Sequence, residues 1–214
     1  MFLSPTDMQA IEARVAALEK SHGVEVVTVV VGKSDVYPEV VWKAFALGAS
    51  LTALAVAVAE VARPDWISAS AVLSAVLAIL GVGALCALAS VYVPAFARLF
   101  LRESRASLEV HQFAKVQFLE RELFDTQTRT AILVVVSLLE RRVVILADTG
   151  LRAHAGVADW DAVIARMTPP LGQGRTGEAL QAGLAAIGEL LAGKSIARGR
   201  GNAFADKPIE EAGP

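Results

Sequence analysis

Acidic side chains lie close to the ends of two predicted strands in the second half of the sequence. Residues 131–138 and 142–148 are mainly aliphatic and predict two strands, and the tight connection between them favours an antiparallel hairpin. Asp125 precedes the first strand and Asp148 ends the second, so their carboxylates are expected to share one edge of the sheet. Glu140 lies in the connection, at the opposite end of the hairpin.

These carboxylates suggest two kinds of chemistry. Calcium takes about six to eight oxygen ligands, so Asp125 and Asp148 are candidate ligands of a divalent cation such as calcium. Arg129 could orient a phosphate beside them, since a cation and a guanidinium group both neutralise phosphoryl charge. Asp125, Arg129 and Asp148 are therefore candidate catalytic residues. The alternative is that the acidic residues stabilise turns and cap helices, which is the more frequent role of such residues.

Other patterns in the sequence carry less chemistry. Residues 172–177 match G-x-G-x-x-G, but a dinucleotide site needs a strand directly before the motif, and here a helix ended by Pro169 and Pro170 precedes it. An interhelical turn is the expected structure. The run 140–142 (ERR) predicts a solvated hairpin tip, and the three histidines show no ligand spacing.

A long apolar block precedes these candidate residues. Its two arms, 44–61 and 66–96, are separated by a break that contains Glu60, Arg63, Pro64 and Asp65. A helix rises about 1.5 Å per residue and the hydrocarbon core is about 30 Å thick, so about 20 apolar residues span it. The sequence predicts a transmembrane hairpin. The alternative, a pair of buried core helices, is disfavoured because a short soluble chain can hardly cover two helices that are apolar on every face.

Small residues occur along both arms and would let the two helices approach each other or a partner helix closely. They are Gly48, Ser50, Ala53, Ala57, Gly81, Gly83 and Ala87.

The composition agrees with a membrane protein that has a modest water-facing part. Of 214 residues 55% are hydrophobic and only 20% are charged, and a net charge of -2 gives no reason to expect nucleic-acid binding. The basic residues near the outer ends of the arms are Lys33, Lys43, Arg98, Arg102 and Arg105. The connecting turn holds Arg63 alone, so the positive-inside rule places both termini in the cytoplasm.

The segments on either side of the apolar block are expected to form one domain. Residues 4–22 predict an amphipathic helix and 24–31 a buried strand, but neither half of the chain has enough strands to be stable alone. We therefore expect an α/β fold with a small central sheet flanked by helices and interrupted by the hairpin. The expected divisions are 1–43 and 101–193 for the domain, 44–100 for the hairpin, and 194–214 for a disordered tail.

Most of the chain except the tail resembles the TPM domain family, also called TPM phosphatases, and within it a bacterial subgroup of predicted membrane proteins; residues 4–31 are similar to the family's opening helix and strand. The residues that carry the resemblance are RTAIL (129–133), SLLERRV (137–143) and ADTG (147–150), with the Trp160 helix and the 175–177 turn. The resemblance implies a central sheet with helices on both faces. It also implies an integral, multi-pass protein of the bacterial inner membrane.

For function, the resemblance implies acid phosphatase activity or calcium binding in some relatives and assembly of membrane complexes in others. Arg129 and Thr130 stand where many relatives have Asn-Gly, which leaves the acidic pattern of the enzyme incomplete. The first expectation is a non-enzymatic, membrane-anchored binding or assembly module, with the lipid bilayer and another membrane protein or itself as partners. The alternative is a metal-dependent acid phosphatase-like hydrolase.

Overall fold

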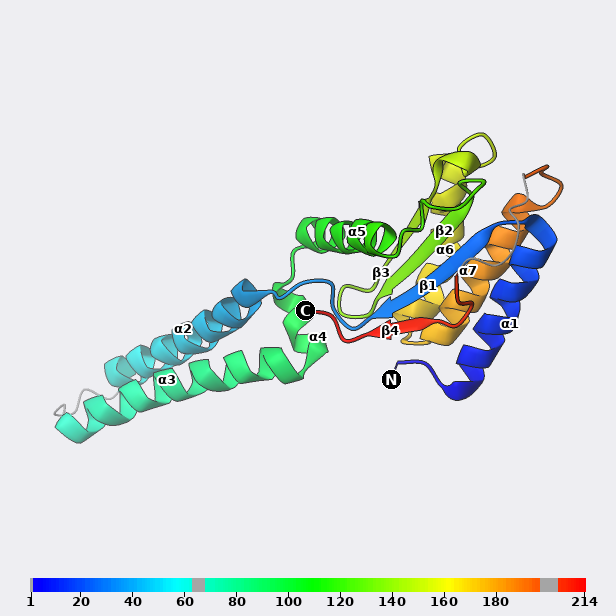
Figure 1. Cartoon of the computed structure of the whole chain (residues 1–214). Coiled ribbons are helices and arrows are strands. Elements are labelled where there is room, and N and C mark those ends of the chain that lie inside the picture. The colour runs from blue at the N-terminus through cyan, green and yellow to red at the C-terminus, as the bar shows by residue number, and fades with distance from the viewer. Residues whose placement is uncertain (1, 63–67, 197–203) are drawn as a thin grey trace. The chain divides into compact units, whose positions relative to one another are not determined.

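A computed structural model describes residues 2–62, 68–196 and 204–214, and the chain divides into two compact units (Figure 1). The first unit combines Met1–Asp35 with Ser104–Pro214 and is called the α/β unit here. The second unit, Val36–Glu103, is called the helical unit. The α/β unit is thus assembled from two segments that lie on either side of the helical unit in the sequence.

The α/β unit contains a four-stranded mixed sheet with the order β3-β2-β1-β4. Its strands are β1 (Glu25–Val31), β2 (Ala131–Ser137), β3 (Arg142–Ala147) and β4 (Ile209–Glu211). Strands β1 and β2 pair in parallel, from Glu25 opposite Ala131 to Val31 opposite Ser137. Strands β2 and β3 form the predicted antiparallel hairpin. The pairing of β1 with β2 confirms that the two halves of the chain build one sheet.

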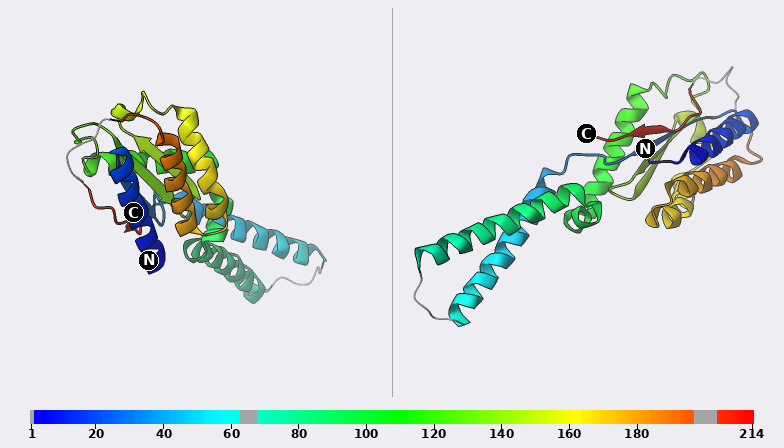
Figure 2. Two further views of the ribbon diagram at one scale, coloured as in Figure 1. Left: turned by 90° about the vertical axis from the view of Figure 1, so that its right-hand side faces the viewer. Right: turned by 90° about the horizontal axis from the view of Figure 1, so that it is seen from below.

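The central strands are buried on both faces, which explains their β-branched composition. Residues Val26, Val30 and Val134 face α1 (Pro5–His22), α6 (Val157–Gly172) and α7 (Thr176–Leu191). The alternate residues Val29 and Val135 face α5 (Glu103–Glu120). Figure 2 shows α1 and α7 side by side, with α6 next to α7. This arrangement confirms the α/β class with helices on both faces.

Helix α1 begins and ends as its sequence predicts. Ser4 is the N-cap and its side chain accepts a hydrogen bond from the Asp7 N–H, while Pro5 opens the helix. Gly23 ends it in the left-handed region with a φ of 71°.

Two predictions about the C-terminal part of the chain are wrong. Helix α6 does not end before Pro169 and Pro170 but continues to Gly172, and Leu171 in this last turn is buried in the core. The two prolines remove backbone donors there, and the helix ends two residues after Pro170. The expected disordered tail contains β4, which pairs in parallel with β1. A three-residue edge strand has too little periodicity to be seen in the sequence and becomes ordered only against its partner. Residues 197–203 of the expected tail lie outside the described residues.

The helical unit contains the two apolar arms. Helices α2 (Pro38–Ala62) and α3 (Ala69–Tyr92) are each long and apolar enough to cross a membrane. The second arm is shorter than predicted because Pro94 cannot continue α3; it opens the short helix α4 (Pro94–Ala97), which is followed by the 3-10 turn η1 (Arg98–Phe100). Arg63, Pro64 and Asp65 of the predicted break lie outside the described residues.

Candidate functional site

Asp148 closes strand β3 and caps the turn that follows it. Its N–H donates to the Ala131 carbonyl at 2.9 Å, and its Oδ1 accepts a hydrogen bond of 2.6 Å from the Thr149 N–H. This places the carboxylate at the start of the 3-10 turn η2 (Thr149–Leu151). The side chain is only 4% exposed, so its charge needs a nearby partner.

Arg129 supplies that partner from the loop before β2. Its Nε lies 2.9 Å from Asp148 Oδ2, yet Oδ2 accepts no hydrogen bond from the described residues, so the contact is an ion pair with poor hydrogen-bond alignment. Arg129 has a φ of 55°, and the Gly150 N–H donates to its carbonyl at 2.8 Å. A Cβ at Gly150 would lie 2.6 Å from that carbonyl oxygen, so the backbones approach too closely for a side chain there.

Asp125 lies in the same loop but is not brought into this ion pair. It is exposed, and its N–H donates to the Glu122 carbonyl at 2.7 Å. Within the described residues, no group of three or more Asp, Glu, His or Cys side chains could hold a metal ion. The structure therefore joins Arg129 to Asp148, while Asp125 stays a separate, solvent-facing carboxylate.

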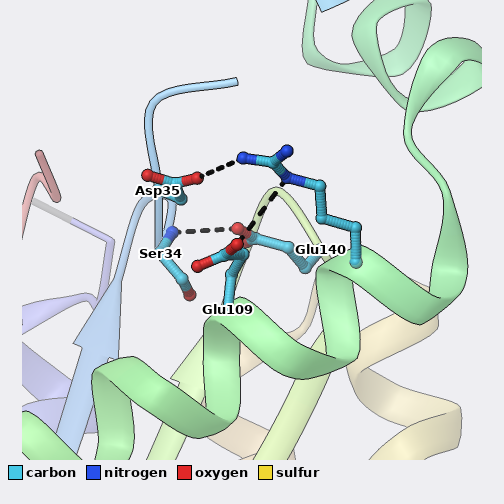
Figure 3. Close-up of polar contacts among 5 residues, drawn as sticks. Ser34, Asp35, Glu109 and Glu140 are labelled. Carbon is cyan, nitrogen blue, oxygen red and sulfur yellow. Dashed lines mark hydrogen bonds and ion pairs between the residues drawn. The ribbon is translucent and has the colours of Figure 1, made fainter. Parts of the chain in front are cut away.

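A second polar cluster lies at the end of the sheet opposite to Asp148, beyond the carboxyl ends of β1 and β2 (Figure 3). Ser34 Oγ donates to Ser137 Oγ at 3.0 Å, and Ser137 Oγ donates in turn to Glu140 Oε2. The Ser34 N–H closes the ring by donating to Glu140 Oε1 at 2.9 Å. Glu140 is therefore bound to the chain after β1, and the prediction of a solvated hairpin tip is wrong for this residue.

An arginine between two carboxylates lies beside this ring. Arg105 Nη2 lies 3.1 Å from Asp35 Oδ2, and Arg105 Nε lies 3.7 Å from Glu109 Oε1, one helical turn along α5. The three side chains are partly exposed, at 45%, 30% and 20% respectively. Because two carboxylates neutralise the guanidinium group, the trio is unsuited to binding a phosphate. The groups Ser34, Asp35, Arg105, Glu109, Ser137 and Glu140 are called the carboxyl-edge cluster below.

Most of the carboxyl-edge cluster was missed by the sequence analysis. Ser137 directly follows a run of valines and ends β2, and Ser34 lies three residues after the valine run that ends β1. Carboxyl ends of parallel strands meet at one edge of a sheet, and binding sites concentrate there. The signal becomes usable only once β1 and β2 are known to be parallel and in register.

The carboxyl group of Glu19, in the α/β unit, has a shifted pKa. Burial raises the pKa of Glu19, at the end of α1, from 4.5 to about 7. The Val26 N–H donates to its Oε1 at 2.9 Å and opposes the shift, whereas the negative charges of Asp206 and Glu25 reinforce it. Asp206 also hydrogen-bonds the Glu19 side chain, so this carboxyl group joins α1 to the C-terminal segment.

The glycine-rich motif forms the expected turn between two helices. Gly172 ends α6 and Gly177 lies in the first turn of α7. A Cβ at Gly177 would come within 2.8 Å of three atoms of the Asp7 carboxylate, so this glycine permits the close packing of α7 on α1. The motif has a packing role here.

Comparisons with known proteins agree with the fold. Residues 89–190 match the model of the TPM domain family, labelled TPM phosphatase. The chain also resembles the NMR structure of the BA42 protein from the psychrophilic bacterium Bizionia argentinensis, with a TM-score of 0.58 and 13% identity over 98% of this chain and 96% of that one. At this identity the likeness shows the fold alone. No curated protein matches the chain. The match supports the TPM domain resemblance, and the membrane-protein subgroup stays a prediction.

Proposed function

We propose that this TPM-domain protein is a membrane-anchored binding module. In this proposal α2 and α3 cross the bacterial inner membrane as a hairpin, with both termini in the cytoplasm. The α/β unit then recognises another membrane protein or a second copy of the chain and helps to assemble a membrane complex.

One observation carries the membrane part of the proposal: large apolar side chains are exposed along both long helices. Examples are Leu51, Leu54 and Val58 on α2 and Leu77, Leu85 and Leu88 on α3, each more than half exposed. Burying one such side chain is worth roughly 1.5–3 kcal/mol, so a surface of this kind is unstable in water. Buried core helices would have these side chains covered, and they are not covered by the described residues.

The engagement of the polar groups supports binding over catalysis. Asp148 is paired with Arg129, and Asp35 and Glu109 are paired with Arg105. Glu140 accepts hydrogen bonds on both of its oxygens. Side chains held in this way shape a surface, whereas a hydrolase needs a nucleophile or a metal-bound water next to a cation that is open to phosphate.

Membrane fractionation and crosslinking of the full chain test the proposal. We expect the chain to stay in the pellet after an alkaline carbonate wash and to be released only by detergent. Crosslinking in native membranes should then recover a homo-oligomer or the same partner in repeated captures. Release by carbonate would contradict the membrane anchor, and repeated capture of neither partner nor oligomer would contradict the binding role.

A metal-dependent phosphatase-like hydrolase is the second candidate, and one observation favours it. Asp148 Oδ2 is buried beside Arg129 and accepts no hydrogen bond from the described residues, which leaves it able to bind a cation. Asp125 would supply a further oxygen from the loop that also carries Arg129. The two candidates differ in the effect that they expect of Asp148→Asn on phosphomonoester hydrolysis.

A further inference from the structure

The outer edge of β1 is covered by the chain's own C-terminal segment. Strand β4 pairs in parallel with β1 over only three residues, with Ile209 opposite Val29 and Glu211 opposite Val31. The Gly32 N–H extends the pairing by donating to the Glu211 carbonyl at 2.9 Å. A strand this short is held by few ladder hydrogen bonds, so side-chain contacts must account for much of its attachment.

Two adjacent glutamates of β4 are recognised separately, one on each face of the sheet. Glu210 Oε1 accepts hydrogen bonds from the Phe2 N–H at 2.5 Å and the Leu3 N–H at 2.7 Å. Glu211 points to the other face, since neighbouring residues of a strand alternate. There its Oε1 lies 2.7 Å from Arg121 Nη2, and its Oε2 accepts from Gln117 Nε2 at 3.0 Å.

The two side chains that bind Glu211 also bind each other. Arg121, directly after α5, donates from Nε to Oε1 of Gln117 in the last turn of that helix at 2.6 Å, which orients both side chains toward the same carboxylate. Ile209 packs into the apolar cluster between the sheet and α5. The edge therefore binds a particular pattern: an aliphatic residue followed by two carboxylates in an extended segment.

From these contacts we infer that the outer edge of β1 is an exchangeable docking site, filled in assemblies by the 209–211 segment of a second copy of this chain. The inference rests on the proposed binding function and names the surface that performs it. A second copy offers the same aliphatic residue and the same two carboxylates, so the exchange needs no new complementarity. Confinement of both copies to one membrane raises their effective concentration and favours the exchange.

A peptide experiment tests the docking site on the full chain in detergent or nanodiscs. The probe is a fluorescent peptide with the sequence of residues 204–214 (FADKPIEEAGP). A chain that carries Glu210→Gln and Glu211→Gln holds its own segment less tightly and should bind the probe about tenfold more tightly than the wild-type chain. Adding Arg121→Ala should remove that gain, whereas adding Arg166→Ala, which breaks an ion pair with Glu189 elsewhere, should preserve it.

A mixing experiment tests the occupant. Two full-length populations, both with Cys86→Ala, carry Val29→Cys or Ile209→Cys. After mixing and mild oxidation we expect a disulfide-linked dimer that contains one chain of each kind. A matched mixture of Ile209→Cys with Leu146→Cys, on β3 away from this edge, should give none.

Equal probe affinity for all variants, or the absence of the mixed dimer, would overturn the inference. If either result came with a partner or oligomer still captured from membranes, the inference would fail while the proposed function stood. If capture failed as well, both would be rejected.

Discussion

Arg105 and Asp35 form an ion pair between the two points at which the chain leaves and re-enters the α/β unit. Arg105 Nη2 lies 3.1 Å from Asp35 Oδ2; Asp35 is the last residue of the first segment of the unit, and Arg105 is the second residue of the next segment. The helical unit is thus inserted between two residues that remain in contact. The ion pair therefore joins the two segments of the α/β unit where the helical unit is inserted in the sequence.

Breaking this ion pair should have a small effect on stability. Because both side chains are partly exposed, solvent screens their attraction, and we expect a coupling free energy of about 0.2–1 kcal/mol. A double-mutant cycle with Arg105→Ala, Asp35→Ala and the double variant measures it by chemical denaturation in detergent. A coupling of zero would show that the contact does not join the two segments energetically.

Ser137→Ala should destabilise the α/β unit by about 1–3 kcal/mol. Ser137 is fully buried, and its hydroxyl both accepts from Ser34 Oγ and donates to Glu140 Oε2. Loss of the Ser137 hydroxyl leaves the buried Ser34 Oγ and the Glu140 Oε2 atom without this partner. Denaturant unfolding measures the change, and Ser21→Ala, which removes an exposed hydroxyl at the end of α1, is the matched control. Equal effects of the two substitutions would argue against the buried ring.

Glu19 should make the stability of the chain fall as pH rises from about 4.5 to about 7. Its pKa is raised to about 7 in the folded chain by burial and by Asp206 and Glu25, so the folded state binds more protons than the unfolded state in this window. The folded chain loses that proton as pH rises, so the stabilisation that the proton gives to the folded state is gone above about pH 7.

Glu19→Gln should remove this part of the pH dependence and stabilise the chain at pH 8. The amide keeps an oxygen that can accept from the Val26 N–H but carries no charge. Unfolding midpoints at pH 5 and pH 8 check the prediction, with Glu12→Gln, an exposed glutamate of the same helix, as the control. An unchanged pH slope in Glu19→Gln would contradict it.

Asp148→Asn separates the two candidate functions. The proposed binding role expects hydrolysis of a generic phosphomonoester, with calcium or magnesium present, to be unaffected by this substitution. The phosphatase alternative expects a loss of about a hundredfold, because the charge that holds the cation is removed. The measurement compares wild type, Asp148→Asn and the exposed control Asp161→Asn. Turnover that is lost only in Asp148→Asn would favour the enzyme, and unchanged turnover would reject the assignment of Asp148.

Gly48→Ala should weaken the pairing of α2 with α3, whereas Gly81→Ala should not. A Cβ at Gly48 would lie 2.7 Å from Cys86 Sγ and 3.1 Å from the Val82 carbonyl oxygen, while one at Gly81 would meet no atom within 4 Å. Overpacking of this kind costs about 1–3 kcal/mol, against a gain of about 1 kcal/mol in helix propensity at either position. Thermal stability of the detergent-solubilised chain compares the two variants. A lower midpoint for Gly81→Ala than for Gly48→Ala would contradict the observed packing.

Local structure was largely predictable because its causes are local. Ser4, Pro5 and Gly23 mark the ends of α1, since caps act over a few residues. The aliphatic runs around β1, β2 and β3 identified three strands, and the tight connection before Arg142 identified the hairpin. The two long apolar helices α2 and α3 were equally predictable. The rise per residue of a helix gives the length of each, and that length can be compared directly with the thickness of a bilayer.

The candidate sites were less predictable because they depend on pairing between distant segments. The sequence placed Asp125 with Asp148, whereas the structure joins Asp148 to Arg129 and leaves Asp125 exposed. Which side chain of a loop turns toward a strand end depends on its backbone, here on the positive φ of Arg129. The amino-acid composition of the loop does not determine this backbone conformation.

By itself, the sequence determined where helices and strands form, that two helices are long and apolar, and that the halves of the α/β unit must combine. Only the tertiary structure decided that Ser34 meets Ser137, 103 residues away, and that the segment with Glu210 and Glu211 pairs with the outer edge of β1. The physical reason is register: a parallel pairing between distant strands selects which polar residues share an edge, and no short-range pattern encodes that selection.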